Sequence, residues 1–186
     1  SEYLPRIIAA AKGTSLNIGD GSVKINGDTK DLVQNYIERT CESTFANPLG
    51  KRFVYKTRIK IEDFMDLSAG EVSDDNYTSR TNLFNGLYNV SFTIEKDGLY
   101  YKTNDNGTEI WKKAENFVPD NEYHNYKVIA DIDTAAIFVD GTVVAENVVL
   151  PKSKDSMFGF TVGYKAKAKT AQSDNISVLI DEMSLD

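Results

Sequence analysis

The sequence predicts an all-β protein, built as an antiparallel β-sandwich. Short runs that alternate apolar and polar residues recur along most of the chain, as in strands with one buried face. Gly, Asn and Asp turns separate these runs, and no stretch has a convincing helical pattern. The length of 186 residues suits one domain spanning 1–186, in which 1–20 forms either an irregular or an edge segment.

The first third of the chain contains two ambiguous segments. Residues 5–11 (PRIIAAA) fit either a short helix or a first edge strand, and SVKI at 22–25 is a short strand candidate. Residues 31–40 (DLVQNYIERT) favour a strand over a helix. From 53 to 64, FVYKTRIKIEDF alternates clearly.

A long polar loop is expected from 68 to 85. If loops carry the specificity of binding, we expect Tyr77, Arg80 and Asn82 to provide it.

The second half of the chain has the clearest strand signals. Two strands are predicted on either side of a turn at Lys96-Asp97-Gly98, and a second turn at Asp105-Asn106-Gly107 leads into TEIWKKAENFV. Asp140-Gly141 forms a third turn between the strands 135–139 and 142–150. MFGFTVGYKAKA and NISVLIDEMSLD provide the last two strands.

Charge and cysteine content exclude several classes of protein. A net charge of −7 opposes nucleic-acid partners, which are bound mainly through Lys and Arg. No apolar run approaches the roughly 20 residues of a membrane helix, so no membrane insertion is expected. The lone Cys41 excludes an internal disulfide and is interpreted as structural. Because the chain begins at Ser1, we expect a mature or excised domain of a larger extracellular or cell-surface protein.

One stretch, Tyr123 to Glu146, resembles a known superfamily. Tyr123-His124-Asn125-Tyr126 is followed by Ile137-Phe138-Val139-Asp140-Gly141 and a short apolar strand, and this arrangement resembles the concanavalin A-like lectin and glucanase superfamily. The resemblance covers residues 20–186 and implies a jelly roll. It implies no single activity, because enzymes, lectins, laminin-G-like modules and lyases share the fold. The single histidine, His124, is interpreted as a packing or rim residue.

The catalytic motifs of this superfamily are absent. Its glucanases carry Glu-x-Asp-x-x-Glu on one strand, and its alginate lyases carry Gln-x-His. Neither spacing occurs here, although Gly163-Tyr164-Lys165-Ala166 is similar to a lyase segment. We therefore expect a protein without catalytic residues.

Carbohydrate binding is the function that these observations favour. Sugars stack on aromatic rings and hydrogen-bond to amides, hydroxyls and guanidinium groups. Residues of these types are expected on one shared outer face of the sandwich: Lys56, Arg58, Asn89, Ser91, Tyr100 and Thr161. Trp111 is a further candidate, although burial in the core is the favoured interpretation for a lone Trp.

Calcium is considered separately, because β-sandwich binding modules resemble one another in a structural calcium near the first and last strands. No cofactor is required, but Asp181 and Asp28 are the candidate ligands, with Glu182, Asp186 and Asp20 nearby in sequence. Solvated acidic residues remain the favoured interpretation.

The sequence therefore predicts a non-catalytic module that binds a polysaccharide or glycan. The alternatives are a glycoside hydrolase or lyase of the same fold, and a structural or adhesion domain.

Overall fold

The computed structural model describes residues 4–9, 15–19, 21–28, 33–41, 52–85, 88–131, 133–152, 158–166 and 175–185. Side chains are described within 21–27, 52–83, 88–131, 133–152 and 175–184. The strands are β1 (Leu4–Ala9), β2 (Ser15–Gly19), β3 (Ser22–Asp28), β4 (Val33–Cys41), β5 (Phe53–Asp63), β6 (Tyr77–Asn85), β7 (Asn89–Glu95), β8 (Gly98–Asp105), β9 (Thr108–Lys113), β10 (Tyr123–Ala130), β11 (Thr134–Val139), β12 (Thr142–Val149), β13 (Phe158–Ala166) and β14 (Asn175–Leu185). A short 3-10 helix, η1 (Ala69–Glu71), lies between β5 and β6.

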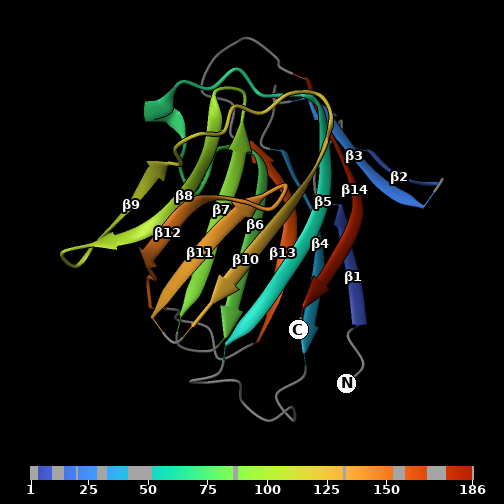
Figure 1. Cartoon of the computed structure of the whole chain (residues 1–186). Coiled ribbons are helices and arrows are strands. Elements are labelled where there is room, and N and C mark those ends of the chain that lie inside the picture. The colour runs from blue at the N-terminus through green and yellow to red at the C-terminus, as the bar shows by residue number, and fades with distance from the viewer. Residues whose placement is uncertain are drawn as a thin grey trace.

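The described strands form two seven-stranded antiparallel sheets that lie face to face (Figure 1). Sheet A has the order β1-β4-β13-β6-β7-β8-β9, and sheet B has the order β12-β11-β10-β5-β14-β3-β2. Late strands insert between early ones, since β13 lies between β4 and β6 and β14 between β3 and β5. The protein is an antiparallel β-sandwich of the jelly-roll type, as the sequence predicts.

The core fills the space between the two sheets. Tyr55 and Ile59 of β5 are buried on the inner face of sheet B, and Phe92 of β7 is buried on the inner face of sheet A. The Phe92 and Tyr126 rings join the two sheets, with 6.0 Å between their centres. Burial of these apolar side chains between the sheets is the main stabilising contribution to folding.

Two of the predicted turns have the backbone that tight hairpins require. Asn106 and Gly107 both have positive φ, at 50° and 88°, and Asp140 and Gly141 have φ of 49° and 82°. Asn, Asp and Gly tolerate this left-handed conformation better than other residues. These turns fix the register of β8 with β9 and of β11 with β12.

The structure resolves the ambiguous segments and corrects one prediction. Residues 4–9 are an edge strand of sheet A, and the strand prediction for 31–40 is confirmed by β4. The predicted loop from 68 to 85 is wrong beyond residue 76, because Tyr77–Asn85 forms β6, inside sheet A. Tyr77 and Leu83 join the core near the two ends of this strand, but Ser79 and Thr81 between them are polar yet buried, so the sequence shows no continuous apolar face.

The expectations about a membrane helix, Cys41 and the number of domains are tested only in part. No helix among the described residues is long and apolar enough to cross a membrane. The side chain of Cys41 lies outside the described residues, and the assignment of 1–186 to a single domain stays a prediction.

Candidate functional site

The structure divides the predicted binding residues between two opposite faces of the sandwich. Lys56 and Arg58 lie on β5, on the outer face of sheet B. Sheet A carries the others: Asn89, Ser91, Tyr100, Trp111 and Thr161. Alternation along a strand tells inward from outward residues but not which of two sheets the strand joins. The expectation of one shared face is therefore wrong for Lys56 and Arg58.

A row of polar residues crosses the outer face of sheet A, the face turned away from sheet B. Cα register pairs Thr161 with Asn82 and Asn82 with Ser91, and the Ser91 hydroxyl donates a hydrogen bond to Asn82 Oδ1. Farther along the sheet, Lys102 pairs with Trp111. The Thr161 side chain lies outside the described residues. The register therefore brings three of the predicted binding residues onto one row.

Arg80 lies at the centre of this outer face. Its guanidinium carbon is 5.2 Å from the ring centre of Tyr77 and 5.3 Å from that of Trp111. Because β7 and β8 separate the strands of Arg80 and Trp111, these two side chains reach toward each other across the sheet. Cation–π contacts with two rings hold the guanidinium in place. Its Nε is buried and has no hydrogen-bond partner among the described residues.

Asp74 connects Arg80 to Lys102. The Asp74 backbone oxygen accepts a hydrogen bond of 3.1 Å from Arg80 Nη1, and its carboxylate lies 3.5 Å from Arg80 Nη2 and 2.8 Å from Lys102 Nζ. Lys102 Nζ also lies 2.9 Å from a Glu109 oxygen. We call Asp74, Tyr77, Arg80, Lys102 and Trp111 the Arg80–Trp111 cluster. Both of its cations already have carboxylate partners, which favours a neutral polar ligand over an anionic one.

Trp111 differs from its favoured interpretation as a core residue. Its indole is partly exposed on the outer face of sheet A. The cause is register: Trp111 pairs with Lys102, which points outward, whereas the neighbouring Tyr101 packs against the core. Large, partly exposed rings of this kind provide flat apolar contact area for ligands.

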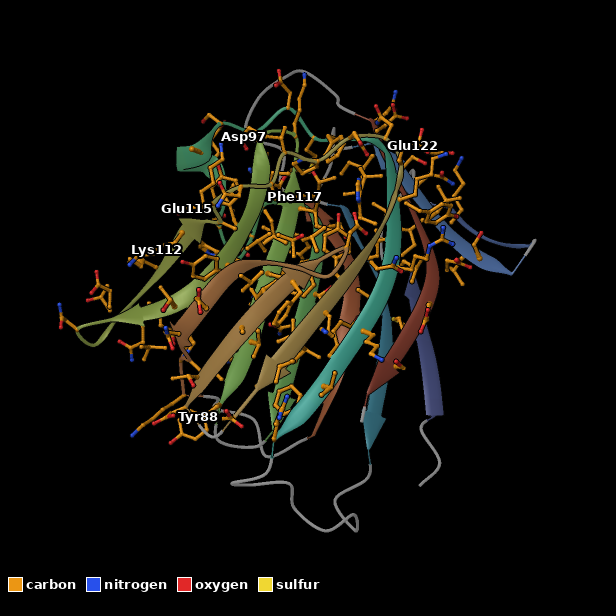
Figure 2. The ribbon with its side chains drawn as sticks, viewed as in Figure 1. Tyr88, Asp97, Lys112, Glu115, Phe117 and Glu122 are labelled. Carbon is orange, nitrogen blue, oxygen red and sulfur yellow. The ribbon has the colours of Figure 1, made fainter. Side chains whose placement is uncertain are left out.

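Tyr100 is buried beneath the outer face and is not an exposed binding residue. It is 3% exposed, and its hydroxyl donates a hydrogen bond of 2.8 Å to Asp97 Oδ2. Burial, together with this bond and the Asp97 charge, raises the pKa of Tyr100 to about 12. Asp97 lies at the turn between β7 and β8 (Figure 2). Tyr100 therefore supports the face from below.

Glu95 is a buried carboxyl group that the sequence did not single out. Its Oε1 accepts a 2.8 Å hydrogen bond from the Thr78 backbone N–H and lies 2.7 Å from Thr93 Oγ1, and its Oε2 lies 2.7 Å from Thr78 Oγ1. Burial outweighs these bonds and raises the pKa of Glu95 to about 7. The Thr93 hydroxyl is also 2.6 Å from the Ser79 carbonyl oxygen. Its one hydrogen cannot serve both acceptors, so a protonated Glu95 that donates to Thr93 satisfies every group.

His124 lies at one end of β10, between two carboxylates. Its Nδ1 is 2.6 Å from Asp140 Oδ2, and its Nε2 is 2.7 Å from Asp120 Oδ1. Burial lowers the pKa of His124, but these two hydrogen bonds and the charges behind them outweigh burial and raise it. The Phe117 ring packs edge-on against the imidazole at 5.5 Å. With both ring nitrogens engaged, His124 joins the loop before β10 to the β11–β12 turn, which is a structural role.

The candidate calcium ligands cannot share an ion. Asp28 pairs with Asn175 at the start of β14, whereas Asp181 lies six residues farther along that strand. Six strand residues span about 20 Å, while calcium ligands lie within about 2.6 Å of the ion. Asp181 forms an ion pair with Arg58 instead.

No group of three or more His, Cys, Asp or Glu side chains that could hold a metal occurs within the described ranges. The side chains of Asp28, Asp20 and Asp186 lie outside them.

A cleft of about 550 Å³ lies at the edge of the sandwich, between β9 and β12. Tyr101, Lys112, Glu115, Val143 and Glu146 line it, and Figure 2 shows Lys112 and Glu115 beside β9. The lining of the cleft includes Lys112 and Lys113 of β9 but neither Trp111 nor Arg80. The cleft is therefore separate from the Arg80–Trp111 cluster.

No protein-family model and no curated protein matches this sequence. Several solved structures share its fold. A sialidase has a TM-score of 0.64 and 9% identity, over 98% of this chain and 17% of that one. An alginate lyase of polysaccharide lyase family 7 has a TM-score of 0.60 and 10% identity, over 96% and 84%. The binding domain of botulinum neurotoxin DC, in complex with rat synaptotagmin II, has a TM-score of 0.58 and 15% identity, over 98% and 43%.

These likenesses concern the fold. The chain spans less than half the length of the botulinum neurotoxin DC binding domains that it matches, covering 43% of one and 42% of another. Identities of 9–15% establish a common jelly-roll architecture and no more. Membership in the concanavalin A-like superfamily stays a prediction from the Tyr123–Glu146 stretch.

Proposed function

We propose that this chain is a non-catalytic carbohydrate-binding module and that the outer face of sheet A is its binding surface. The observation that carries the proposal is the Arg80–Trp111 cluster, in which a partly exposed indole lies beside a guanidinium group on the outer face of sheet A. The C–H face of a sugar packs on an aromatic ring while its hydroxyls take hydrogen bonds from fixed donors. The cluster supplies both kinds of contact within one side-chain length.

The polar row beside the cluster extends the proposed surface. Half-buried Asn82 and Asn89 add amide groups on β6 and β7. Ser91 is 1% exposed, so its hydroxyl does not reach a ligand and instead holds the Asn82 amide in place. The Asn89 Oδ1 atom is buried and has no partner among the described residues. Amide groups that are partly exposed can hydrogen-bond to the hydroxyls of a ligand.

The similar structures support this proposal without deciding it. One is a botulinum neurotoxin DC binding domain in complex with SialylT, and another is an alginate lyase, so the fold occurs in proteins that act on or bind carbohydrate. The proposed module belongs to a larger extracellular or cell-surface protein and presents a polysaccharide or glycan to the other domains of that polypeptide. The pairing of Arg80 and Lys102 with Asp74 favours an uncharged glycan at this surface.

Binding of the isolated chain to a panel of glycans and insoluble polysaccharides tests the proposal. Trp111→Ala is expected to weaken binding about tenfold, which corresponds to ~1.4 kcal/mol for a central aromatic contact. Trp111→Phe keeps a ring and is expected to retain most of the affinity. Lys112→Ala, on the other side of β9, serves as the matched control. If no glycan binds, or if Lys112→Ala weakens binding as much as Trp111→Ala, the proposed surface is wrong.

A second candidate function is a polysaccharide-degrading enzyme, and one observation favours it. Glu95 has a pKa of about 7, the value expected of a general acid, and the exposed Asp97 lies two residues away. However, Glu95 is 0% exposed and hydrogen-bonded inside the protein. Release of reducing ends or unsaturated products by the isolated chain would establish the enzyme and overturn the binding module. A protein-adhesion domain would show neither product release nor glycan binding.

A further inference from the structure

The outer face of sheet B carries a group of cations, although the chain has a net charge of −7. β5 places Lys56, Arg58 and Lys60 on this face at alternate positions, about 7 Å apart. Lys127 of β10 is the cross-strand neighbour of Lys56, and Lys24 of β3 lies beyond β14. Charges farther away than the Debye length of about 8 Å are screened, so the local face rather than the net charge decides what binds here.

Carboxylates compensate only part of this positive charge. Arg58 forms an ion pair with Asp181. Lys24 forms one with Glu62, at 2.6 Å. The other three cations of this face take part in no ion pair among the described residues.

The pair of Lys56 and Lys127 is the centre of this face. The two residues lie directly opposite each other on β5 and β10, where like charges destabilise a sheet. Both line a pocket of about 330 Å³, together with Asn125 and Glu182, and the charged side chains in the lining sum to +1. The Lys127 ammonium lies 4.6 Å from the ring centre of Phe138, which holds it on the outer face. An anion seated between the two ammonium groups would relieve their repulsion.

An aromatic ring lies within the same face. Arg58 stacks on Tyr123, with its guanidinium carbon 4.5 Å from the ring centre, and Lys60 Nζ lies 5.8 Å from it. Rings interspersed with cations suit a ligand whose sugar rings carry anionic groups, because each ring can be packed while each charge is neutralised. A row of cations along one strand also matches a linear polymer better than a single ion.

We propose that the outer face of sheet B is an anion-binding surface, centred on the Lys56–Lys127 pair, that takes the sulfate or carboxylate groups of an acidic polysaccharide. This surface lies on the opposite side of the sandwich from the Arg80–Trp111 cluster and does not depend on it. The chain would then have two ligand faces of different charge preference.

Dextran sulfate tests this proposal, with uncharged dextran as the matched polymer. Calorimetric titration of the whole chain is expected to show that dextran sulfate binds more tightly than dextran. The affinity for dextran sulfate is expected to fall about tenfold or more when the salt concentration is raised from about 50 to about 200 mM. The double variant Lys56→Gln/Lys127→Gln is expected to lose about tenfold in affinity and to have a shallower salt dependence. Its melting temperature is expected to be unchanged or higher, because a repulsion is removed.

The control is a double variant with the same change of net charge, Lys96→Gln/Lys152→Gln, made at exposed lysines outside this face. It is expected to lose less than about threefold, as general electrostatic attraction requires. Equal losses in the two double variants, or no binding of dextran sulfate, would overturn the proposal. Binding to vesicles of anionic phospholipid without binding to dextran sulfate would overturn it in favour of a membrane partner. Trp111→Ala is expected to leave dextran sulfate affinity unchanged, so failure here is distinct from failure of the carbohydrate site on sheet A.

Discussion

Replacing Glu95 with glutamine should change how the stability of the protein depends on pH. The pKa of Glu95 is raised from its ordinary value of 4.5 to about 7, because the side chain is fully buried. As pH rises from 4.5 to 7, the unfolded chain releases this proton while the folded chain retains it. The raised pKa therefore stabilises the fold in full below pH 4.5, and this contribution is lost as pH rises through 7.

The shift of about 2.5 pH units corresponds to roughly 3 kcal/mol of unfolding free energy, at ~1.4 kcal/mol per unit. Glutamine has nearly the same shape and carries no charge at any of these pH values. Its amide has two N–H donors, one more than the protonated acid, and any cost of the second donor is the same at every pH. The Glu95→Gln variant should therefore gain stability relative to the wild type as pH rises, by roughly 3 kcal/mol between pH 4.5 and pH 8. Other titrating groups are common to both proteins and cancel in the difference.

Urea unfolding of both proteins at several pH values between 4.5 and 8 measures this difference. The exposed residue Glu122 provides the control, because Glu122→Gln makes the same chemical change at a side chain that is not buried. A free-energy difference between Glu95→Gln and the wild type that stays constant over this range would refute the reasoning. It would mean that Glu95 is already ionised in the folded protein at low pH.

Three further predictions concern the two hydrogen bonds of His124, the core and one turn. The raised pKa of His124 adds stability in full below pH 6.5, and this contribution is lost as pH rises through the pKa that His124 has in the folded protein. His124→Gln should therefore cost about 1 kcal/mol of unfolding free energy at pH 6 and less at pH 9, measured by urea unfolding. An equal cost at both pH values would contradict this role. Phe92→Ala should cost about 3–5 kcal/mol, because it removes a fully buried ring between the sheets, and a loss below about 1 kcal/mol in calorimetry would contradict the packing. Gly141→Ala should lower the melting temperature because its φ is +82°, although a Cβ there would meet no atom within 4 Å, whereas Gly70→Ala should not.

The two-sheet fold was predictable because short local patterns in the sequence identify most of its strands and turns. Alternation along 53–64 and the Asp-Gly and Asn-Gly turns identify strands and their ends, and β5, β8, β9, β11 and β12 follow these signals. The strand β6 was not predicted because the middle of its inward face is polar, and only Tyr77 and Leu83 near its ends join the core. Ser79 and Thr81 fill the middle positions as buried polar residues, which sequence patterns assign to loops.

The candidate site was predictable in composition but not in place. Ser91 and Trp111 were expected to bind carbohydrate, and Arg80 was expected in a specificity loop. The structure joins them on sheet A, because β6 is a strand that brings Arg80 within reach of Trp111. Pairing between strands far apart in the chain decides which outer residues share a face, and no local pattern encodes it.

The buried state of outer residues was equally hidden from the sequence. Glu95 follows Thr93 on the outward side of β7, where alternation predicts a solvated carboxylate. The segment after β5 instead lies against Thr78, to which the Met65 backbone N–H donates a 3.0 Å hydrogen bond. A loop that crosses the end of a sheet can bury an outward position, and its path depends on the whole fold.

The measurement that tests the account most directly is a titration of the protein, and of Trp111→Ala and Arg80→Ala, with whichever uncharged polysaccharide the wild type retains in a pull-down assay, each with calcium and with a chelator. The account predicts saturable binding that is weakened about tenfold by either substitution and persists in the chelator, since Asp28 and Asp181 cannot share an ion. Binding that is unchanged in both variants would contradict the assignment of the outer face of sheet A as the carbohydrate site.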